Sequence, residues 1–304
     1  MKETLRIIIR LTLSCLVAAF FMGAVFTVTD KAKKHNEHQN VQDTMLSLLG
    51  YGRANPAPAD LKMAALYRYI VDDGANKYLG YMVPVKKDGA ESYEFLIIDL
   101  KGNYVERFPL DLSPEAAAEA PTRKATLKTV LKPPRTFVYA DSAIFAGLGE
   151  RRLAYLLPGK FPGFKTFIHA MLALDPSFEI IGLEIMEHEE DPGLGGEIEQ
   201  DYFKNQFKNK SFDKLKEIKV VKEPLPLEYM HYLEALSDPD GAISRKDIEK
   251  IRNKYQDSDI YAITGATISS RAVTSGVKNI AKKFAYRLQI LDRVIDDQEL
   301  NAVF

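Results

Sequence analysis

The sequence has one cysteine and almost no net charge, and both features exclude classes of protein. Cys15 is the only cysteine among 304 residues, so the chain can form neither an internal disulfide nor a metal site of several thiolates. The absence of a C-x-x-C-H motif and of clustered cysteines excludes covalent haem and iron–sulfur clusters ligated by this chain's cysteines. Lys+Arg 41 against Asp+Glu 42 gives a formal charge of -1, which provides no overall positive field for nucleic acid.

Residues 11–29 form the one long run without a charged side chain. As a helix rising about 1.5 Å per residue, this run would reach roughly 28 Å, close to the thickness of the hydrocarbon layer. Lys2, Arg6 and Arg10 would also suit the basic start of a cleaved signal peptide. Because the run is longer than a usual signal core and lacks a small-x-small cleavage site, we expect a retained anchor over residues 1–29. Basic residues flank it on both sides, so charge does not fix its orientation.

The rest of the chain reads as a polar tether followed by one domain. Residues 30–60 are polar and end in N-P-A-P-A-D, and we expect the domain to occupy residues 61–304. Its first part predicts strands with a hairpin turn at 101–103, and then a short helix that Ser113 caps and Pro114 begins. The expected strands cover residues 65–70, 77–85 and 93–110.

The second part of the domain mixes further hairpins with scattered helices. We expect a strand at 136–140, a loop at 158–164, and an antiparallel pair at 165–174 and 178–187 around Asp175-Pro176-Ser177. Helices are predicted at 202–212 and on either side of the D-P-D-G sequence at 238–241, within 227–255. This arrangement lacks the regular strand–helix alternation of a parallel sheet. The predicted class is therefore α+β, with an antiparallel or mixed sheet.

The T-G-A-T sequence at 264–267 is a small, tight turn at the start of an amphipathic helix. Gly265 permits a positive φ and close approach, and Thr267 would be reachable. Ser269 or Ser270 is a candidate N-cap, and the first turn holds Arg271 and no acid, which suits a bound phosphate. The alternative is a glycine turn that leads into a buried helix. The expected buried face comprises Ala272, Val273, Gly276, Val277, Ile280, Ala281 and Phe284.

A second unusual segment, residues 187–207, is rich in glycine and acid. Pro192 fixes one backbone dihedral, while the glycines around Leu194 would let the backbone lie flat against a planar ring. An ordinary glycine-rich hairpin loop is the alternative. His188 is expected to be a hydrogen-bonded structural residue rather than a ligand or proton donor.

Both segments resemble one family, the FMN-binding RnfG/NqrC subunits of Rnf and Na+-translocating NADH:quinone reductase complexes. The family's flavinylation motif reads roughly D-x-x-[S/T]-G-A-[T/S], and T-G-A-T matches its last four positions, while the acidic position falls on Tyr261, with Asp259 two residues earlier. The sequence H-E-E-D-P-G-L-G at 188–195 is similar to the family's H-x-E-T-P-G-L-G, with Asp191 in place of threonine.

The resemblance implies that Thr267 carries FMN through a phosphoester bond. The other cofactor-binding residues that it implies are Thr264, Gly265, Ala266, Ser269, Glu190, Gly193, Leu194 and Gly195. It covers the anchor and roughly residues 75–287, whereas 110–160 and the C-terminal tail match no part of the family that we can name. No catalytic residue and no metal site is expected.

The resemblance also implies a place in the cell and a set of partners. The chain would be a single-pass protein of the bacterial inner membrane with its soluble domain in the periplasm, matured by a flavin transferase and working beside other membrane subunits of an Rnf-type complex. I-S-S-R-A-V at 268–273 favours the Rnf branch. Two alternatives stay open: a stand-alone flavinylated electron carrier outside the cytoplasm, and an anchored binding or scaffold module without flavin.

Overall fold

The computed structural model describes residues 2–87, 89–149, 151–236 and 245–304, and the chain divides into two units, Met1–Ser47 and Leu48–Phe304. Helix α1 (Lys2–Leu48) accounts for the first unit. Its segment Glu3–Thr27 is long and apolar enough to cross a membrane, with a mean hydropathy of 2.1, although a signal sequence has the same character. The helix continues through the first part of the expected tether. Within that tether, residues 49–60 form neither helix nor strand.

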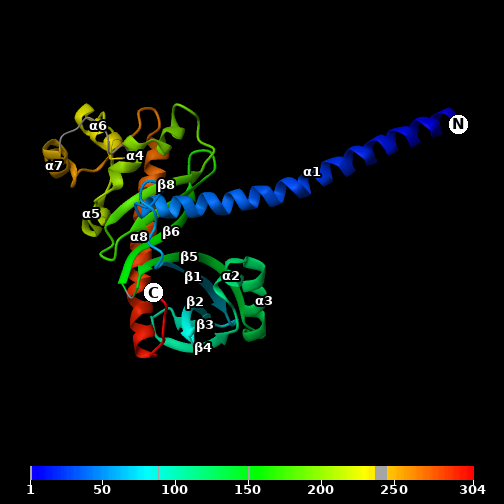
Figure 1. Cartoon of the computed structure of the whole chain (residues 1–304), viewed down its shortest axis with the longest axis horizontal. Coiled ribbons are helices and arrows are strands. Elements are labelled where there is room, and N and C mark those ends of the chain that lie inside the picture. The colour runs from blue at the N-terminus through cyan, green and yellow to red at the C-terminus, as the bar shows by residue number, and fades with distance from the viewer. Residues whose placement is uncertain (1, 88, 150, 237–244) are drawn as a thin grey trace. The chain divides into compact units, whose positions relative to one another are not determined.

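The second unit is built on an eight-stranded antiparallel sheet with the order β4-β3-β2-β1-β5-β6-β7-β8 (Figure 1). The predicted α+β class is thus confirmed, as are the hairpin turn at 101–103 and the antiparallel pair around 175–177. The strands are β1 (Leu61–Asp72), β2 (Lys77–Lys87), β3 (Ala90–Asp99), β4 (Tyr104–Leu110), β5 (Thr136–Leu148), β6 (Arg151–Pro162), β7 (Phe167–Leu174) and β8 (Ile180–Glu187).

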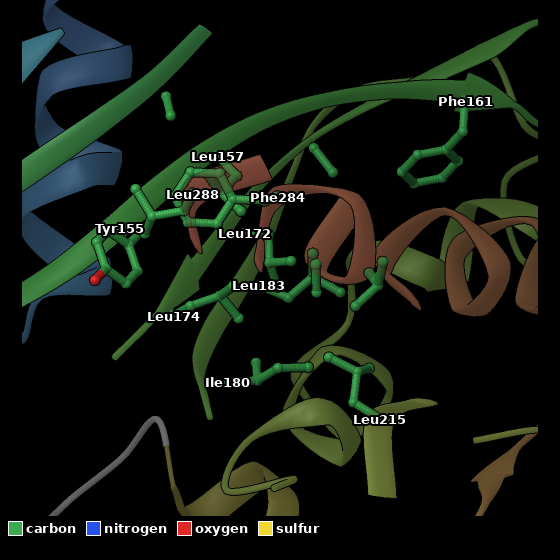
Figure 2. Packing of buried hydrophobic residues seen from close by; sticks show 14 of the residues in the cluster. Tyr155, Leu157, Phe161, Leu172, Leu174, Ile180, Leu183, Leu215, Phe284 and Leu288 are labelled. Carbon is green, nitrogen blue, oxygen red and sulfur yellow. The ribbon is translucent and has the colours of Figure 1, made fainter. Parts of the chain in front are cut away.

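Helices cover both faces of this sheet. Helix α8 (Thr267–Asp297) buries its predicted apolar face against one side, where the larger core lies, and Figure 2 shows Phe284 and Leu288 of α8 among leucines of β6, β7 and β8. The opposite face of β1–β4 packs against α2 (Pro114–Ala118) and α3 (Ala120–Val130). Ser113 caps α2 as predicted, because its hydroxyl accepts from the Ala116 N–H.

Short elements connect β8 to α8. They are the 3₁₀ helices η1 (Gly195–Glu199) and η2 (Asn205–Phe207), helices α4 (Asp201–Lys204), α5 (Phe212–Glu217), α6 (Leu227–Ala235) and α7 (Arg245–Tyr255), and the parallel pair β9 (Val220–Val221) and β10 (Ile260–Tyr261). The helix predicted at 202–212 is therefore broken into short pieces. Helices α6 and α7 confirm the prediction for 227–255, and the D-P-D-G sequence between them lies outside the described residues.

The loop predicted at 158–164 was wrong, because β6 continues to Pro162 and pairs with β7 as far as Pro162–Phe167. Prolines are tolerated there because this half of β6 is an edge. Its pairing with β5 ends at Ile144–Leu156, so residues 157–162 have a strand partner on one side only. Backbone N–H groups of residues an even number apart point to the same side of a strand. Pro158 and Pro162 are four residues apart, so the two missing N–H groups fall on the same side of β6.

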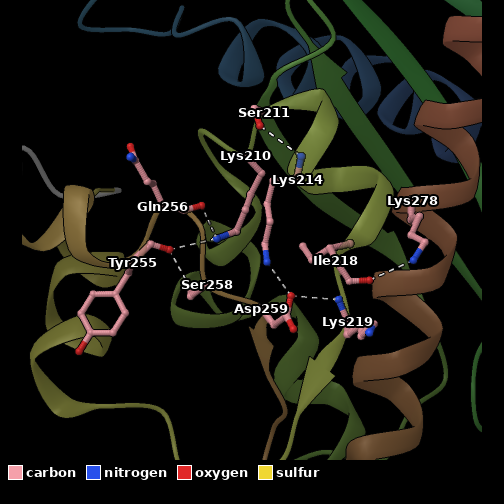
Figure 3. A network of polar contacts seen from close by, with 10 residues as sticks. All are labelled: Lys210, Ser211, Lys214, Ile218, Lys219, Tyr255, Gln256, Ser258, Asp259 and Lys278. Atoms are coloured by element: carbon pink, nitrogen blue, oxygen red, sulfur yellow. Dashed lines mark hydrogen bonds and ion pairs between the residues drawn. The ribbon is translucent and has the colours of Figure 1, made fainter.

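Lys210 is a buried cation that fixes the end of α7. Its side chain is 1% exposed, and Nζ donates to the carbonyls of Tyr255 (3.2 Å) and Gln256 (2.9 Å), as Figure 3 shows. Two backbone acceptors at a helix C-terminus are thereby satisfied. Burial, followed by the nearby Lys214 ammonium, lowers the pKa of Lys210 to about 8.

We expect this pKa to make stability depend on pH. Between about pH 8 and 10.5 the unfolded chain keeps the Lys210 proton while the folded chain has released it, so the free energy of unfolding rises with pH. The neutral amine still donates to both carbonyls. Relative to Lys210→Met, the wild-type free energy of unfolding should rise by on the order of 2–3 kcal/mol across this window. Urea denaturation of both chains at a series of pH values measures the difference, and parallel curves would contradict the assignment.

Candidate functional site

The T-G-A-T sequence forms a β-turn directly before α8. The Ala266 N–H donates to the Ile263 carbonyl at 3.0 Å, and Gly265, at the third position of the turn, has φ +78°. A positive φ at this position is typical of a type II turn and favours glycine. Ser270 holds the turn in place, because its hydroxyl accepts from the Ile263 N–H and donates to the Ala266 carbonyl. Thr264 and Gly265 are therefore displayed at the surface, and Thr267 is half-buried.

Helix α8 begins at Thr267, so the expectation that Ser269 or Ser270 caps it was wrong. Ala266 occupies the N-cap position and cannot supply a side-chain acceptor. Within the described part of the chain, nothing accepts from the N–H groups of Thr267, Ile268 or Ser269. The first turn holds no acid, as expected. A helix of 31 residues thus presents free donors and the positive end of its dipole beside a threonine hydroxyl.

The second motif forms a similar turn. The Leu194 N–H donates to the Asp191 carbonyl at 3.1 Å, with Pro192 and Gly193 (φ +71°) between them. The same carbonyl also accepts from the Gly196 N–H at 2.8 Å. Proline followed by a residue of positive φ again fits a type II turn. This turn leads into η1, which contacts α8.

The two turns lie against each other. A Cβ added at Gly265 would meet Leu194 Cδ2 at 3.1 Å, and one added at Gly195 would meet Ser269 Oγ at 2.7 Å and Glu190 Oε2 at 2.6 Å. Gly265 is favoured by its positive φ and by the nearby Leu194 side chain, and at Gly195 the Glu190 carboxylate and the Ser269 hydroxyl occupy the space of a side chain. The fold therefore brings the two sequence motifs, which lie about 70 residues apart in the chain, into one surface feature.

Glu190 joins these turns to a third segment. Its side chain is 5% exposed, and Oε1 accepts from the backbone N–H of Phe164 (2.7 Å) and of Lys165 (3.2 Å). Oε2 accepts from the buried hydroxyl of Ser269 in the first turn of α8. Charge-assisted hydrogen bonds and the positive end of a helix both stabilise a buried carboxylate. Glu190 and Ser269 are thus placed to support the site from beneath.

His188 takes the structural role expected of it. Its Nδ1 accepts from the Glu190 N–H at 3.0 Å, which places the proton of the neutral ring on Nε2. That atom lies 2.8 Å from a Glu199 carboxylate oxygen but without the geometry of a hydrogen bond, so the loop is held by the Nδ1 contact. The ring therefore braces the loop from which Glu190 extends.

Exposed apolar side chains come from the three segments that meet at the site. Leu194 is 47% exposed, Ile268 59% and Phe164 58%. Sequence reasoning missed Phe164, Lys165 and Ile268. The signal available was the P-G-F sequence at 162–164, because Gly163 leaves room for the Glu190 carboxylate, which an added Cβ would meet at 2.4 Å.

The acidic position of the family motif has no carboxylate at the turn in this structure, since Tyr261 occupies it and the Asp259 side chain is engaged elsewhere. The Tyr261 backbone exchanges hydrogen bonds with the buried amide of Gln206, at 2.8 and 3.3 Å. Asp259 accepts from Lys214 Nζ at 2.8 Å and from the Lys219 N–H (Figure 3). Although burial opposes the change, the hydrogen bond from Lys214 lowers the pKa of Asp259.

Comparisons with known proteins identify a domain family over part of the chain. Residues 163–282 match the family described as "FMN-binding domain", and this range includes both turns and the Phe164 segment. The G-type subunit of the proton-translocating ferredoxin:NAD(+) oxidoreductase complex of Clostridium ljungdahlii is 30% identical over 135 residues. The alignment covers 44% of this chain and 55% of that protein, so the chain spans just over half of its length.

Solved structures give weaker likenesses. NqrC of Shewanella oneidensis aligns with a TM-score of 0.32 at 20% identity, over 50% of this chain and 59% of that one. The C-type subunit of the Na(+)-translocating NADH-quinone reductase of Parabacteroides distasonis aligns with a TM-score of 0.33 at 19% identity, over 65% and 74%. The sequence matches show that this chain contains an FMN-binding domain and is distantly homologous to subunits of the RnfG kind.

Proposed function

We propose that the Thr267 hydroxyl carries FMN through a phosphoester bond. The observation that carries the proposal is the meeting of the two turns inside the region of the FMN-binding domain. Thr267 is a hydroxyl-bearing residue at the very start of α8, beside N–H groups that have no acceptor in the described chain. A phosphate at a helix N-terminus accepts hydrogen bonds from such groups and is stabilised by the dipole.

Attachment replaces one bond to phosphorus by another. The Thr267 oxygen forms a P–O bond to the FMN phosphate and loses its proton, while the leaving group of an activated flavin donor departs with its electron pair. A flavin transferase would supply that donor and the catalysis. Since Glu190 is buried and fully engaged with Phe164, Lys165 and Ser269, this chain's contribution is to present the hydroxyl and the phosphate donors.

The surroundings of Thr267 suit a flat ring system as well as a phosphate. Thr264, Gly265 and Ala266 on one turn and Gly193 and Gly195 on the other keep the surface low. The exposed side chains Leu194, Ile268 and Phe164 offer apolar contacts around it. Exposed apolar groups gathered at one place are typical of binding sites.

Bound there, FMN would accept and donate electrons, and the chain would serve in electron transfer as part of a larger assembly. We further propose that α1 anchors it in the bacterial inner membrane with the larger unit in the periplasm, beside other membrane subunits of an Rnf-type ion-translocating oxidoreductase. The similarity to the G-type subunit of a ferredoxin:NAD(+) oxidoreductase complex supports this over a stand-alone carrier. Co-purification of such subunits from the native host tests it, and a flavinylated chain isolated alone would favour the stand-alone carrier.

Substitution at Thr267 tests the attachment directly. When the full chain is co-expressed with a flavin transferase and denatured, the wild-type gel band should fluoresce under ultraviolet light. Thr267→Ala should abolish the fluorescence, because no oxygen remains to hold the phosphate, whereas Thr267→Ser should keep it. Ser275→Ala, an exposed position on the same helix, is the matched control. A fluorescent Thr267→Ala band, or a wild-type peptide without added mass by mass spectrometry, would refute the assignment.

Ser269 should support the site without carrying the flavin. Ser269→Ala leaves Glu190 Oε2 without its donor in a buried position, which should lower the free energy of unfolding by about 1–3 kcal/mol. Fluorescence in denatured gel bands should persist, since the Thr267 hydroxyl is intact. Thermal unfolding measures the first effect, with Ser275→Ala expected to stay within about 0.5 kcal/mol of wild type. Full stability together with lost fluorescence would assign attachment to Ser269 instead.

A further inference from the structure

A cavity of about 540 Å³ lies between strands β1, β5 and β6 and the middle of α8. None of its lining residues belongs to either turn of the flavin site. Sites for small organic molecules commonly have volumes of about 300–1,000 Å³ and combine apolar walls with a few polar groups. The cavity therefore has the size of a ligand site.

The cavity exists because the sheet divides. Strands β5 and β6 pair only up to Ile144–Leu156, and beyond that point β5 stays with β1 while β6 stays with β7. Residues 136–143 and 157–162 consequently form two diverging edges. Helix α8 closes the space from one side, and it comes close to β6 where Gly159 faces Ile280 and Gly276 faces Phe161.

The walls of the cavity are largely apolar and aromatic. Tyr139 turns its ring toward Tyr69 on the other face of the sheet, and the lining side chains on the face covered by α8 are mostly buried. The deeper lining includes Leu66, Tyr81, Leu157, Phe161, Phe284 and Leu288. Three aromatic rings, those of Tyr81, Phe161 and Phe284, come from different elements, so a flat apolar body could contact rings on more than one side.

Positive charge dominates the polar part of the lining. The lining includes Arg68, Lys160, Lys283 and Arg287 but a single carboxylate, Asp141. That carboxylate is shared: Arg68 donates to it through Nε (2.8 Å) and Nη2 (2.5 Å), and Arg287 through Nη1 (2.9 Å). One negative charge between two guanidinium groups leaves an excess of positive charge before the lysines are counted.

Lys283 and one remaining guanidinium donor are available to a ligand. Lys283 has no carboxylate within 4.0 Å among the described residues. Lys160 lies between Gly159 and Phe161, which face α8, so its side chain points to the other face of β6, where Nζ lies 4.5 Å from the centre of the Phe167 ring. Arg287 uses Nε for the Lys283 carbonyl and Nη1 for Asp141, which leaves Nη2 without a partner among the residues described. Guanidinium groups bind carboxylates and phosphates with good geometry.

We propose that this cavity is a second ligand site, which takes a small organic anion with a flat apolar body. Its carboxylate or phosphate would meet Lys283 and Arg287, and its body would lie among the aromatic rings. The volume of about 540 Å³ suits one such molecule rather than a lipid with two acyl chains. Lys283 lies sixteen residues after Thr267 on α8, or about 24 Å along the helix, so this ligand would not occupy the proposed flavin position.

Binding of 2-naphthoate, an aromatic carboxylate, tests the proposal. Isothermal titration of the full flavinylated chain in detergent, corrected for empty micelles, should show one equivalent bound. Lys283→Glu should raise the dissociation constant at least about tenfold, because it replaces an attractive charge at the site by a repulsive one. Lys282→Glu makes the same charge change at an exposed neighbour outside the cavity lining and should change the constant less than about twofold.

Three results would overturn the proposal. They are no binding to wild type, equal weakening by Lys282→Glu and Lys283→Glu, and equally tight binding of the neutral analogue 2-naphthalenemethanol. Both lysines are exposed, so neither change should affect folding. Gel fluorescence from Thr267 should be the same in both variants, which separates this test from that of the proposed flavin attachment.

Discussion

The buried carboxylate of Glu190 is the contact on which the site depends. It accepts hydrogen bonds from two backbone N–H groups of the Phe164 segment and from the Ser269 hydroxyl of α8. The Glu190 backbone leads into the Leu194 turn. A buried carboxylate costs several kcal/mol of desolvation, and each hydrogen bond to a charged group returns about 1.5–3 kcal/mol. No lysine or arginine side chain hydrogen-bonds to it in the described part of the chain, and the positive end of α8 and the nearby Lys165 ammonium contribute a complementary field. This arrangement fixes three loops relative to the start of the helix.

Helix α8 then connects this contact to the rest of the domain. Its first turn displays Thr267 and unpaired N–H groups, its middle closes the cavity between β5 and β6, and its last turns fill the core beside β6. Glycines set the spacing where it meets the sheet, since a side chain at Gly276 would strike the Phe161 ring at 2.4 Å. The same close packing that buries the helix leaves space only where the sheet divides. The position of α8 therefore determines the core packing and the location of both proposed sites.

Sequence reasoning succeeded where the physical signal is local. Alternating apolar residues with short turns indicated most strands, Ser113 and Pro114 indicated the start of α2, and the apolar periodicity after Thr267 indicated α8. The loop expected at 158–164 was wrong because prolines usually break strands, and nothing local shows that this half of β6 is an edge. Ser269 and Ser270 were taken for caps since their hydroxyls suit that role, but the tertiary partners Glu190 and Ile263 use them instead. The meeting of the two motifs required the fold.

The cavity illustrates what a single sequence cannot reveal. Arg68, Asp141, Lys160 and Lys283 belong to four separate elements, and their relation arises only when β5 leaves β6. A sheet that divides exposes unpaired backbone edges, and such edges are normally blunted by proline, charge or a covering element. Here all three are present: Pro158 and Pro162, the basic side chains, and α8. On the face covered by α8, Arg68, Arg287 and Lys283 meet one carboxylate, Asp141, which leaves an excess of positive charge at the helix and not at the strand edges alone. That excess is the reason for assigning the space to an anion.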